Sequence, residues 1–367
     1  MQVKYAYLDR EYTFFKKKID QNVFNCLKSG SFILRQDVDL FEKKIVNLHG
    51  GNGFCIGVNS GTDALEILLK LSNLPKNSYI IVPSHTYIST VNAIIKAELK
   101  PLFCDIENDG NVHLSNIEST FNKNKNKNIT AVFVTHMNGL IVDMKKISLF
   151  CKKNKLHFFE DAAQAIGSYE NKNTPGRFSD GAAYSLHPLK TLSVAGDGGF
   201  IFTKNKKLAK NAKAYRNLGQ YVKGKHEIIG VNSRLDNLHA AIANVKLEKL
   251  KFIIKKRQNH AKKYISSLKK ISDLNLPLFN YDHSFSNFVV NTSRRDELQK
   301  YLTNYNIEVM VHWYPTLNSL KLFQKYSKKN LINTEKYVKS CISLPISPWM
   351  TEEERQFVIN KILDFYK

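Results

Sequence analysis

Short apolar runs rich in β-branched and aromatic residues alternate with longer stretches of helical periodicity between about residues 54 and 203. The runs predict strands buried on both faces, as in a parallel sheet covered by helices. They are Phe54–Val58, Tyr79–Val82, Pro101–Cys104, Ala131–Val134, His157–Phe159, Ala182–Leu186 and Phe200–Thr203. Helical stretches such as Ala64–Leu71 and Lys145–Lys153 lie between them. We therefore predict an α/β fold with a mostly parallel central sheet between helices, whose last strand is an antiparallel partner of the one before it.

The pattern changes after Leu238, where a lysine-rich amphipathic stretch predicts one long helix through about Arg257. Short strands and helices follow it to the end of the chain. We expect a large domain over residues 1–245, including the N-terminal segment, and a smaller C-terminal α+β domain over residues 246–367.

Composition is that of a globular protein, because 43% of the 367 residues are apolar and 11% are aromatic. No apolar run is long enough to span a membrane. Charged residues occur from Lys4 to Glu11, and no apolar core of a signal peptide follows them. Five scattered cysteines form neither a C-x-x-C pair nor a disulfide framework. These features predict a cytoplasmic protein in a reducing compartment.

The formal charge of +23 raises the question of a polyanionic partner. Much of the excess lysine lies in asparagine- and lysine-rich stretches such as 122–128, and no compact basic motif with interleaved aromatic residues is present. We expect neither nucleic acid nor membrane as a partner. A basic surface would still attract small anionic substrates.

Ligands of parallel sheets bind beyond the carboxyl ends of the strands, and four clusters of reactive residues lie at such positions in this sequence. The first cluster is Gly57–Leu65, where a strand stops and a helix starts. Backbone N–H groups around Gly61, together with the Thr62 hydroxyl, would form a phosphate cradle at that helix start. A glycine turn before an ordinary capped helix is the alternative.

The second cluster follows the strand at His157, which carries Glu160 and Asp161 to the sheet edge. A carboxylate there can pair with the pyridinium nitrogen of pyridoxal phosphate (PLP) and keep the ring an electron sink. Gln164 could then bond the phenolic oxygen of the ring. A helix-capping aspartate is the alternative.

The third cluster is Tyr184–Gly199, where Lys190 lies between Leu189 and Leu192 ahead of a glycine-rich turn. A lysine in an apolar setting loses its proton readily and can bind an aldehyde as a Schiff base. Most lysines in so basic a chain are solvated, which is the alternative. Ser185 could add a phosphate contact.

A fourth cluster, Val82–Tyr87, ends in an aromatic residue. Tyr87 could stack on a flat heteroaromatic ring, or it could be a core tyrosine.

Together these segments resemble the DegT/StrS family of nucleotide-sugar aminotransferases, which have the aspartate-aminotransferase type of fold. The resemblance spans nearly the whole chain and is carried by four motifs. They are Ser60–Leu65, Glu160–Gln164, Ser185–Lys190 with Gly196–Gly199, and Gly230–Asp236. Because Lys190 is present, the family's dehydratase branch, which has histidine there, is not favoured.

The resemblance implies a role for each matching residue. Lys190 would bind PLP as a Schiff base and shuttle protons, Asp161 would pair with the pyridinium, and no metal would take part. The remaining cofactor contacts would come from Gly61, Thr62, Tyr87, Gln164, Ser185 and, from the neighbouring subunit, Asn232. The last contact implies a homodimer with shared active sites.

Substrate contacts implied by the resemblance are less sharply defined. His312 and Tyr314 match a His-Tyr substrate segment, although Trp313 separates them here. The other candidates are His136, in a His-x-x-Gly setting, His187 and Arg234.

The function implied is transamination from L-glutamate to a nucleotide-diphosphate-linked keto sugar, in bacterial surface-glycan or related amino-sugar biosynthesis. Carbon 3 is the predicted position, because relatives that act there often have aspartate where this chain has Asp197. Alternatives are a 4-keto sugar, a cyclitol ketone, or a non-catalytic PLP-fold module. The last of these would be expected to lack Lys190 or Asp161.

Overall fold

The computed structural model describes residues 1–327 and 331–367, and a seven-stranded sheet is its centre. The strands are β1 (Phe54–Val58), β2 (Tyr79–Pro83), β3 (Lys100–Cys104), β4 (Ile129–Thr135), β5 (His157–Asp161), β6 (Gly181–Ser185) and β7 (Gly199–Thr203). They lie in the order β1-β7-β6-β5-β4-β2-β3. β7 is antiparallel to both of its neighbours, β1 and β6, and the other pairs in this sheet are parallel. Each predicted strand, including the antiparallel last one, is confirmed to within two residues.

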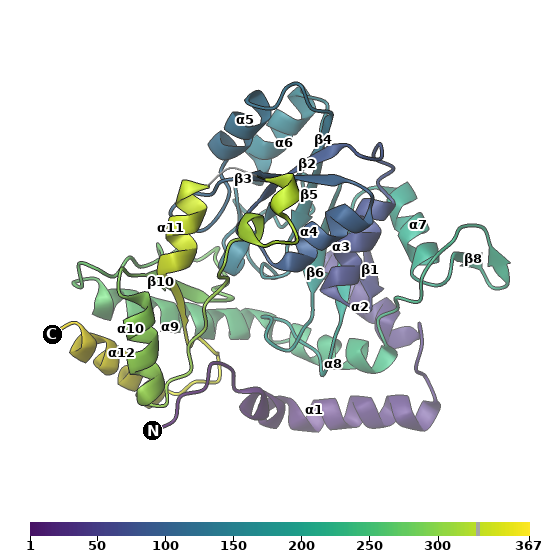
Figure 1. Cartoon of the computed structure of the whole chain (residues 1–367). Coiled ribbons are helices and arrows are strands. Elements are labelled where there is room, and N and C mark those ends of the chain that lie inside the picture. The colour runs from purple at the N-terminus through teal and green to yellow at the C-terminus, as the bar shows by residue number, and fades with distance from the viewer. Residues whose placement is uncertain (328–330) are drawn as a thin grey trace.

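Helices cover both faces of the sheet (Figure 1). One face carries α3 (Gly61–Lys70), α4 (Ile88–Lys96) and α7 (Lys206–Tyr215), and the other carries α2 (Gln36–Leu48), α5 (Leu114–Asn122), α6 (Met144–Lys153) and α8 (Asn237–Leu247). Alternate strand residues supply the two cores, as in β1, where Ile56 packs against α3 and Cys55 packs on the opposite side. The predicted α/β class with a mostly parallel sheet is confirmed.

A smaller body packs beside this sheet around a second apolar core (Figure 1). Its elements are α9 (Leu250–Leu268), β10 (Phe288–Asn291), α10 (Arg295–Asn304), β11 (Cys341–Leu344) and α12 (Glu352–Phe365). Val3 and Tyr7 of the N-terminal segment are buried in the same core. The segment is thus part of the smaller body in space, and the division at residue 245 stays a prediction.

The remaining elements connect or flank the two bodies. They are α1 (Leu8–Ser29), η1 (Met137–Gly139), β8 (Gln220–Val222), β9 (Lys225–His226), η2 (Leu317–Ser319), η3 (Gln324–Tyr326) and α11 (Ile332–Ser340). The β8–β9 hairpin projects away from the body of the molecule (Figure 1). Within the described ranges, no helix has both the length and the apolar character that a membrane span requires.

The single long helix predicted after Leu238 is wrong, because α8 ends at Leu247 and α9 starts at Leu250. Lys249 has a non-helical conformation, with ψ of 10°. The two helices have different surroundings: α8 is buried over most of its length, whereas α9 has an exposed lysine-rich face. The break lets each helix turn its apolar side toward its own core.

Candidate active site

A cavity of about 330 Å³ lies at the carboxyl ends of the parallel strands. Residues that follow β1, β2, β4, β5 and β6 line it, as expected for a ligand site of a parallel sheet. Nine of the predicted site residues line this cavity. They are Gly61, Thr62, Tyr87, Asp161, Gln164, Ser185, His187, Lys190 and His312.

Asp161 is the last residue of β5 and is buried, with 3% of its surface exposed. Thr90 of α4 donates to its Oδ2 at 2.7 Å, and the backbone N–H of Ala163 donates to Oδ1 at 3.0 Å. Burial raises the pKa of Asp161, and these two hydrogen bonds oppose the shift. The carboxylate is therefore held in a fixed position but lacks the solvation that water would give it.

Lys190 lies in the loop after β6, which is closed by backbone hydrogen bonds from Leu186 to Gly198 (2.8 Å) and from Val194 to Leu186 (2.9 Å). Loss of solvent around the amine lowers the pKa of Lys190, and the negative charge of Asp161 opposes that shift. A lowered pKa increases the fraction of free amine near neutral pH. Free amine is the form that attacks an aldehyde.

The start of α3 forms a narrow cradle against the end of β6. The side chain of Ser60 caps the helix by accepting the Asp63 N–H at 3.0 Å. A Cβ on Gly61 would lie 2.7 Å from the Cβ of Ser185, and one on Gly199 would lie 2.4 Å from the Ser60 backbone. Only glycine allows this approach, which brings the Ser185 hydroxyl to the helix N-terminus. Helix N-termini with nearby hydroxyls bind phosphate groups.

Aromatic and amide groups complete the walls of the cavity. Tyr87 is 52% exposed, so its ring face is available, and its ring centroid is 5.4 Å from that of Trp313. Gln164 accepts the Asn138 N–H at 2.6 Å and the Asn287 amide at 3.3 Å through its Oε1. Its own amide nitrogen is left as the donor for a group in the cavity.

Four predicted residues do not line the cavity. His136 is fully buried and bonds Glu160, at 3.2 Å, on the opposite face of the sheet. Arg234 donates to Asn217 at 3.2 Å, and Asn232 is exposed. Tyr314 is 57% exposed and packs against Arg295. The predicted roles of these residues stay predictions.

Several residues that line or support the cavity were missed by sequence reasoning. Tyr5 from the N-terminal segment donates to Asn287 at 3.0 Å and so joins the Gln164 network. Thr90 holds Asp161, and Trp313 lines the cavity in place of its neighbour Tyr314. None of these residues lies in a motif after a predicted strand end. Alternation of side chains from His312 would have favoured Tyr314, yet the adjacent His312 and Trp313 both line the cavity.

These residues fit PLP. The cradle suits its phosphate, a fixed carboxylate suits its pyridine nitrogen, and an amine of lowered pKa suits its aldehyde. Within the part of the chain that the structure describes, no cluster of three His, Cys, Asp or Glu side chains could hold a metal ion.

Comparison with known proteins gives consistent results. Residues 14–363 match the DegT/DnrJ/EryC1/StrS aminotransferase family. A dTDP-3-amino-3,6-dideoxy-alpha-D-galactopyranose transaminase of Aneurinibacillus thermoaerophilus is 34% identical over 95% of both chains. A pleiotropic regulatory protein of Geobacillus stearothermophilus is 32% identical over 100% of this chain and 99% of its own.

Solved structures show the same fold over the whole chain. DesV of S. venezuelae, in complex with a ketimine intermediate, has a TM-score of 0.95 at 28% identity and covers 100% of this chain and 99% of its own. NtdA of Bacillus subtilis with the bound cofactor PMP has a TM-score of 0.91 at 27% identity, covering 99% and 85%. The predicted family, fold class and aminotransferase activity class are thus confirmed. The chain belongs to the DegT/DnrJ/EryC1/StrS aminotransferase family.

Proposed function

We propose that this enzyme binds PLP at Lys190 and transfers an amino group from L-glutamate to the ketone of a nucleotide-diphosphate-linked sugar. One observation carries the proposal: Lys190, Asp161 and the phosphate cradle line the same cavity. Relatives named as dTDP-sugar and UDP-sugar aminotransferases support a nucleotide-linked substrate. Retention of both Lys190 and Asp161 favours an enzyme over a non-catalytic module.

Bound PLP supplies the electron sink that stabilises negative charge on the substrate carbon. Asp161 would hold the proton on the pyridine nitrogen, and the amide nitrogen of Gln164 would donate to the ring oxygen. Gly61, Thr62 and Ser185 would hold the phosphate. Tyr87 would stack on the ring.

The chain's own acid and base is Lys190. Once its amine is free, Nζ would take a proton from the carbon that bears the amino group of the donor. In the second half-reaction it would deliver a proton to the sugar carbon that receives the amino group. Its lowered pKa suits this role, because part of the amine is unprotonated near neutral pH.

We place the sugar on the side of His312 and His187, which line the cavity. The Nδ1 of His312 is 2.7 Å from the Ser343 hydroxyl, and burial lowers the pKa of His312 to about 4. A neutral imidazole then presents Nε2 to a sugar hydroxyl. We also propose substrate contacts for Arg234, His136 and Tyr314, although these residues do not line the cavity.

Carbon 3 is the proposed position of amination. Asp197 lines the cavity, and four relatives carry names that place their amino, oxo or dehydro group at carbon 3. Bacterial surface-glycan or related amino-sugar biosynthesis in the cytoplasm is the pathway class proposed.

The active unit is proposed to be a homodimer. Asn232, which would serve the neighbouring site, is exposed and outside its own chain's cavity. Apolar side chains are exposed nearby in sequence and on α1, including Ile229, Val231, Phe24 and Leu27. Exposed apolar groups of this kind mark protein contact surfaces.

The test is a panel of matched 3-keto and 4-keto sugar nucleotides with L-glutamate, read by mass spectrometry and NMR. The proposal predicts 2-oxoglutarate and a 3-amino sugar. Amination of only the 4-keto compounds would contradict the carbon-3 assignment, and amination of neither series would contradict the sugar substrate.

A further inference from the structure

A second, smaller cavity of about 30 Å³ adjoins the first one. Tyr5, Leu189, Lys190 and Ser286 line both cavities, whereas Arg257 of α9 lines only the smaller. The volume suits one water molecule or one carboxylate group.

Arg257 is a buried cation whose hydrogen-bonding capacity is largely unused. Only 9% of its surface is exposed, and Nη1 donates to the carbonyl oxygens of Phe285 (3.4 Å) and Ser286 (3.1 Å). Its Nε has no partner, and none of the described acidic side chains forms an ion pair with it. Glu11, on the same cavity, forms its ion pair with the Lys246 amine at 2.8 Å, and its charge acts on Arg257 only from beyond ion-pair distance.

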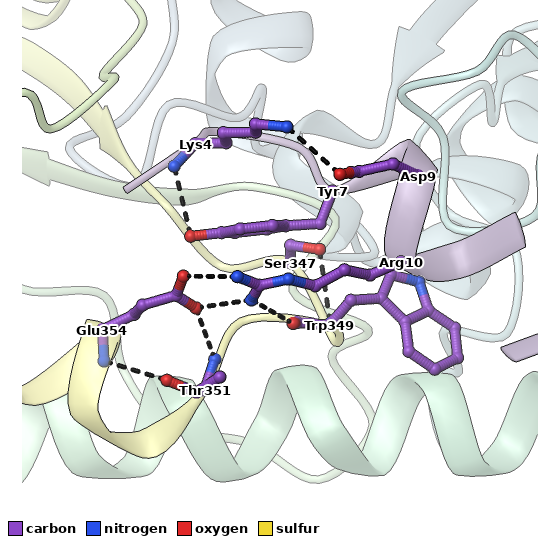
Figure 2. A network of polar contacts seen from close by, with 8 residues as sticks. All are labelled: Lys4, Tyr7, Asp9, Arg10, Ser347, Trp349, Thr351 and Glu354. Carbon is purple, nitrogen blue, oxygen red and sulfur yellow. Dashed lines mark hydrogen bonds and ion pairs between the residues drawn. The ribbon is translucent and has the colours of Figure 1, made fainter. Parts of the chain in front are cut away.

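The N-terminal segment forms one wall of this cavity. Tyr5 and Tyr7 line the cavity, and Arg10 fixes the segment through two 2.8 Å contacts with Glu354 (Figure 2). The Arg10 guanidinium also lies 4.2 Å from the centre of the Tyr7 ring. Since Lys190 lines both cavities, an anion bound at Arg257 would lie next to the active-site lysine.

We propose that Arg257 binds a carboxylate of the amino donor, an inference that rests on the proposed transamination. A guanidinium matches the two oxygens of a carboxylate, and a buried cation without an acidic partner is stabilised by one. The donor then uses the Arg257 end of the site. The sugar nucleotide uses the end lined by Tyr87, His312 and Trp313.

Two half-reactions of the cofactor-loaded enzyme separate these roles. The absorbance of the cofactor is followed with L-glutamate alone, and in reverse with the amino-sugar product alone. For Arg257→Met we expect kcat/KM for L-glutamate to fall about 100-fold, and that for the amino sugar to stay within about twofold. Arg257→Lys, which keeps the charge but loses the fork, should lie between. Equal losses in both half-reactions, or no loss with glutamate, would overturn the inference.

Binding without turnover gives a second readout. Glutarate should raise the Tm of the wild-type protein but not that of Arg257→Met, and it should raise the Tm of Arg257→Lys by less than that of wild type, which serves if the first variant fails to fold. Lys256→Gln, exposed on the same helix, and Arg355→Gln, buried on α12, are controls that should keep the glutarate shift. Equal shifts in wild type and Arg257 variants would overturn the inference. A wild-type enzyme that performs neither half-reaction would instead refute the proposed function.

Discussion

Asp161 and its neighbour Glu160 illustrate how strand geometry separates two carboxylates. Consecutive strand residues point to opposite faces, so Asp161 enters the cavity on the α4 side. Glu160 instead accepts the Gly176 N–H at 2.6 Å and bonds His136 on the other face. The two acids therefore have different tasks, with Glu160 confined to the structure of the sheet.

Replacing Asp161 by Asn should stabilise the cofactor-free protein while destroying its activity. Because burial raises the pKa of Asp161, its contribution to stability is present below the unfolded pKa and is lost as pH rises through the folded pKa. The variant cannot ionise, so its Tm should exceed that of wild type at pH 7 to 8, and the difference should vanish near pH 4. Transamination should fall on the order of 100-fold or more.

Thermal unfolding of both proteins across this pH range checks the prediction. Asp364→Asn removes an exposed carboxyl whose pKa Lys367 lowers, so this control should not raise the Tm. A lower Tm for Asp161→Asn than for wild type at pH 8 would contradict the prediction, because it would show that the ionised carboxylate does not destabilise the folded protein.

The sequence pattern predicted the site residues near strand ends but not those that reach the cavity from distant segments of the chain. Asp161, Gln164 and Lys190 lie within five residues of the end of a predicted strand, and Ser185 lies at the end of one, so a rule about sheet edges locates them. Tyr5 lies 282 residues from its partner Asn287. Contacts over such separations depend on tertiary packing, which local pattern does not encode.

Among the elements, the N-terminal segment has a task that its sequence alone does not reveal. It adds Val3 and Tyr7 to the core of the smaller body and brings Tyr5 to the cavity. The Arg10–Glu354 pair adds an attachment, and Glu354 also caps α12 by accepting the Thr351 N–H at 2.7 Å (Figure 2). One carboxylate thus joins the two ends of the chain.

Breaking this attachment with Arg10→Ala should loosen the segment without unfolding the protein. The pair is partly exposed on the arginine side, so the expected loss is about 1 kcal/mol of unfolding free energy. Limited proteolysis should cleave before α1 faster than in wild type. Lys4→Ala, which removes an exposed ion pair with Asp9, is the matched control and should behave as wild type. Equal cleavage rates in all three proteins would contradict this role of Arg10.

The strands themselves were predictable because a covered parallel sheet needs apolar residues on both faces, as in the run of β4 (Ile129–Thr135). The break between α8 and α9 was not. Apolar residues recur at helical spacing on both sides of Glu248, and neither glycine nor proline marks the boundary. The boundary arises because α8 packs in a core of the large sheet, whereas α9 packs mainly in the core of the smaller body.

For the whole molecule, the proposal of a shared active site makes a test by complementation possible. Lys190→Ala and Asn232→Ala chains should each be inactive alone, because each homodimer lacks one part of every site. Mixed dimers should recover activity, since one of the two sites is complete. About a quarter of wild-type activity is the expected ceiling for random pairing, on the two-fold logic of homodimers. Folded, well-mixed chains that show no recovery would argue against the role of Asn232.

The central claim is that Lys190 holds the cofactor, and borohydride reduction followed by peptide mapping tests it most directly. Reduction makes the bond between lysine and cofactor irreversible, so the modified peptide identifies the lysine. We predict that the purified protein is yellow and that the adduct lies on Lys190, in the peptide after β6, and disappears in Lys190→Ala. An adduct on another lysine, or none in a cofactor-saturated protein, would contradict the assignment.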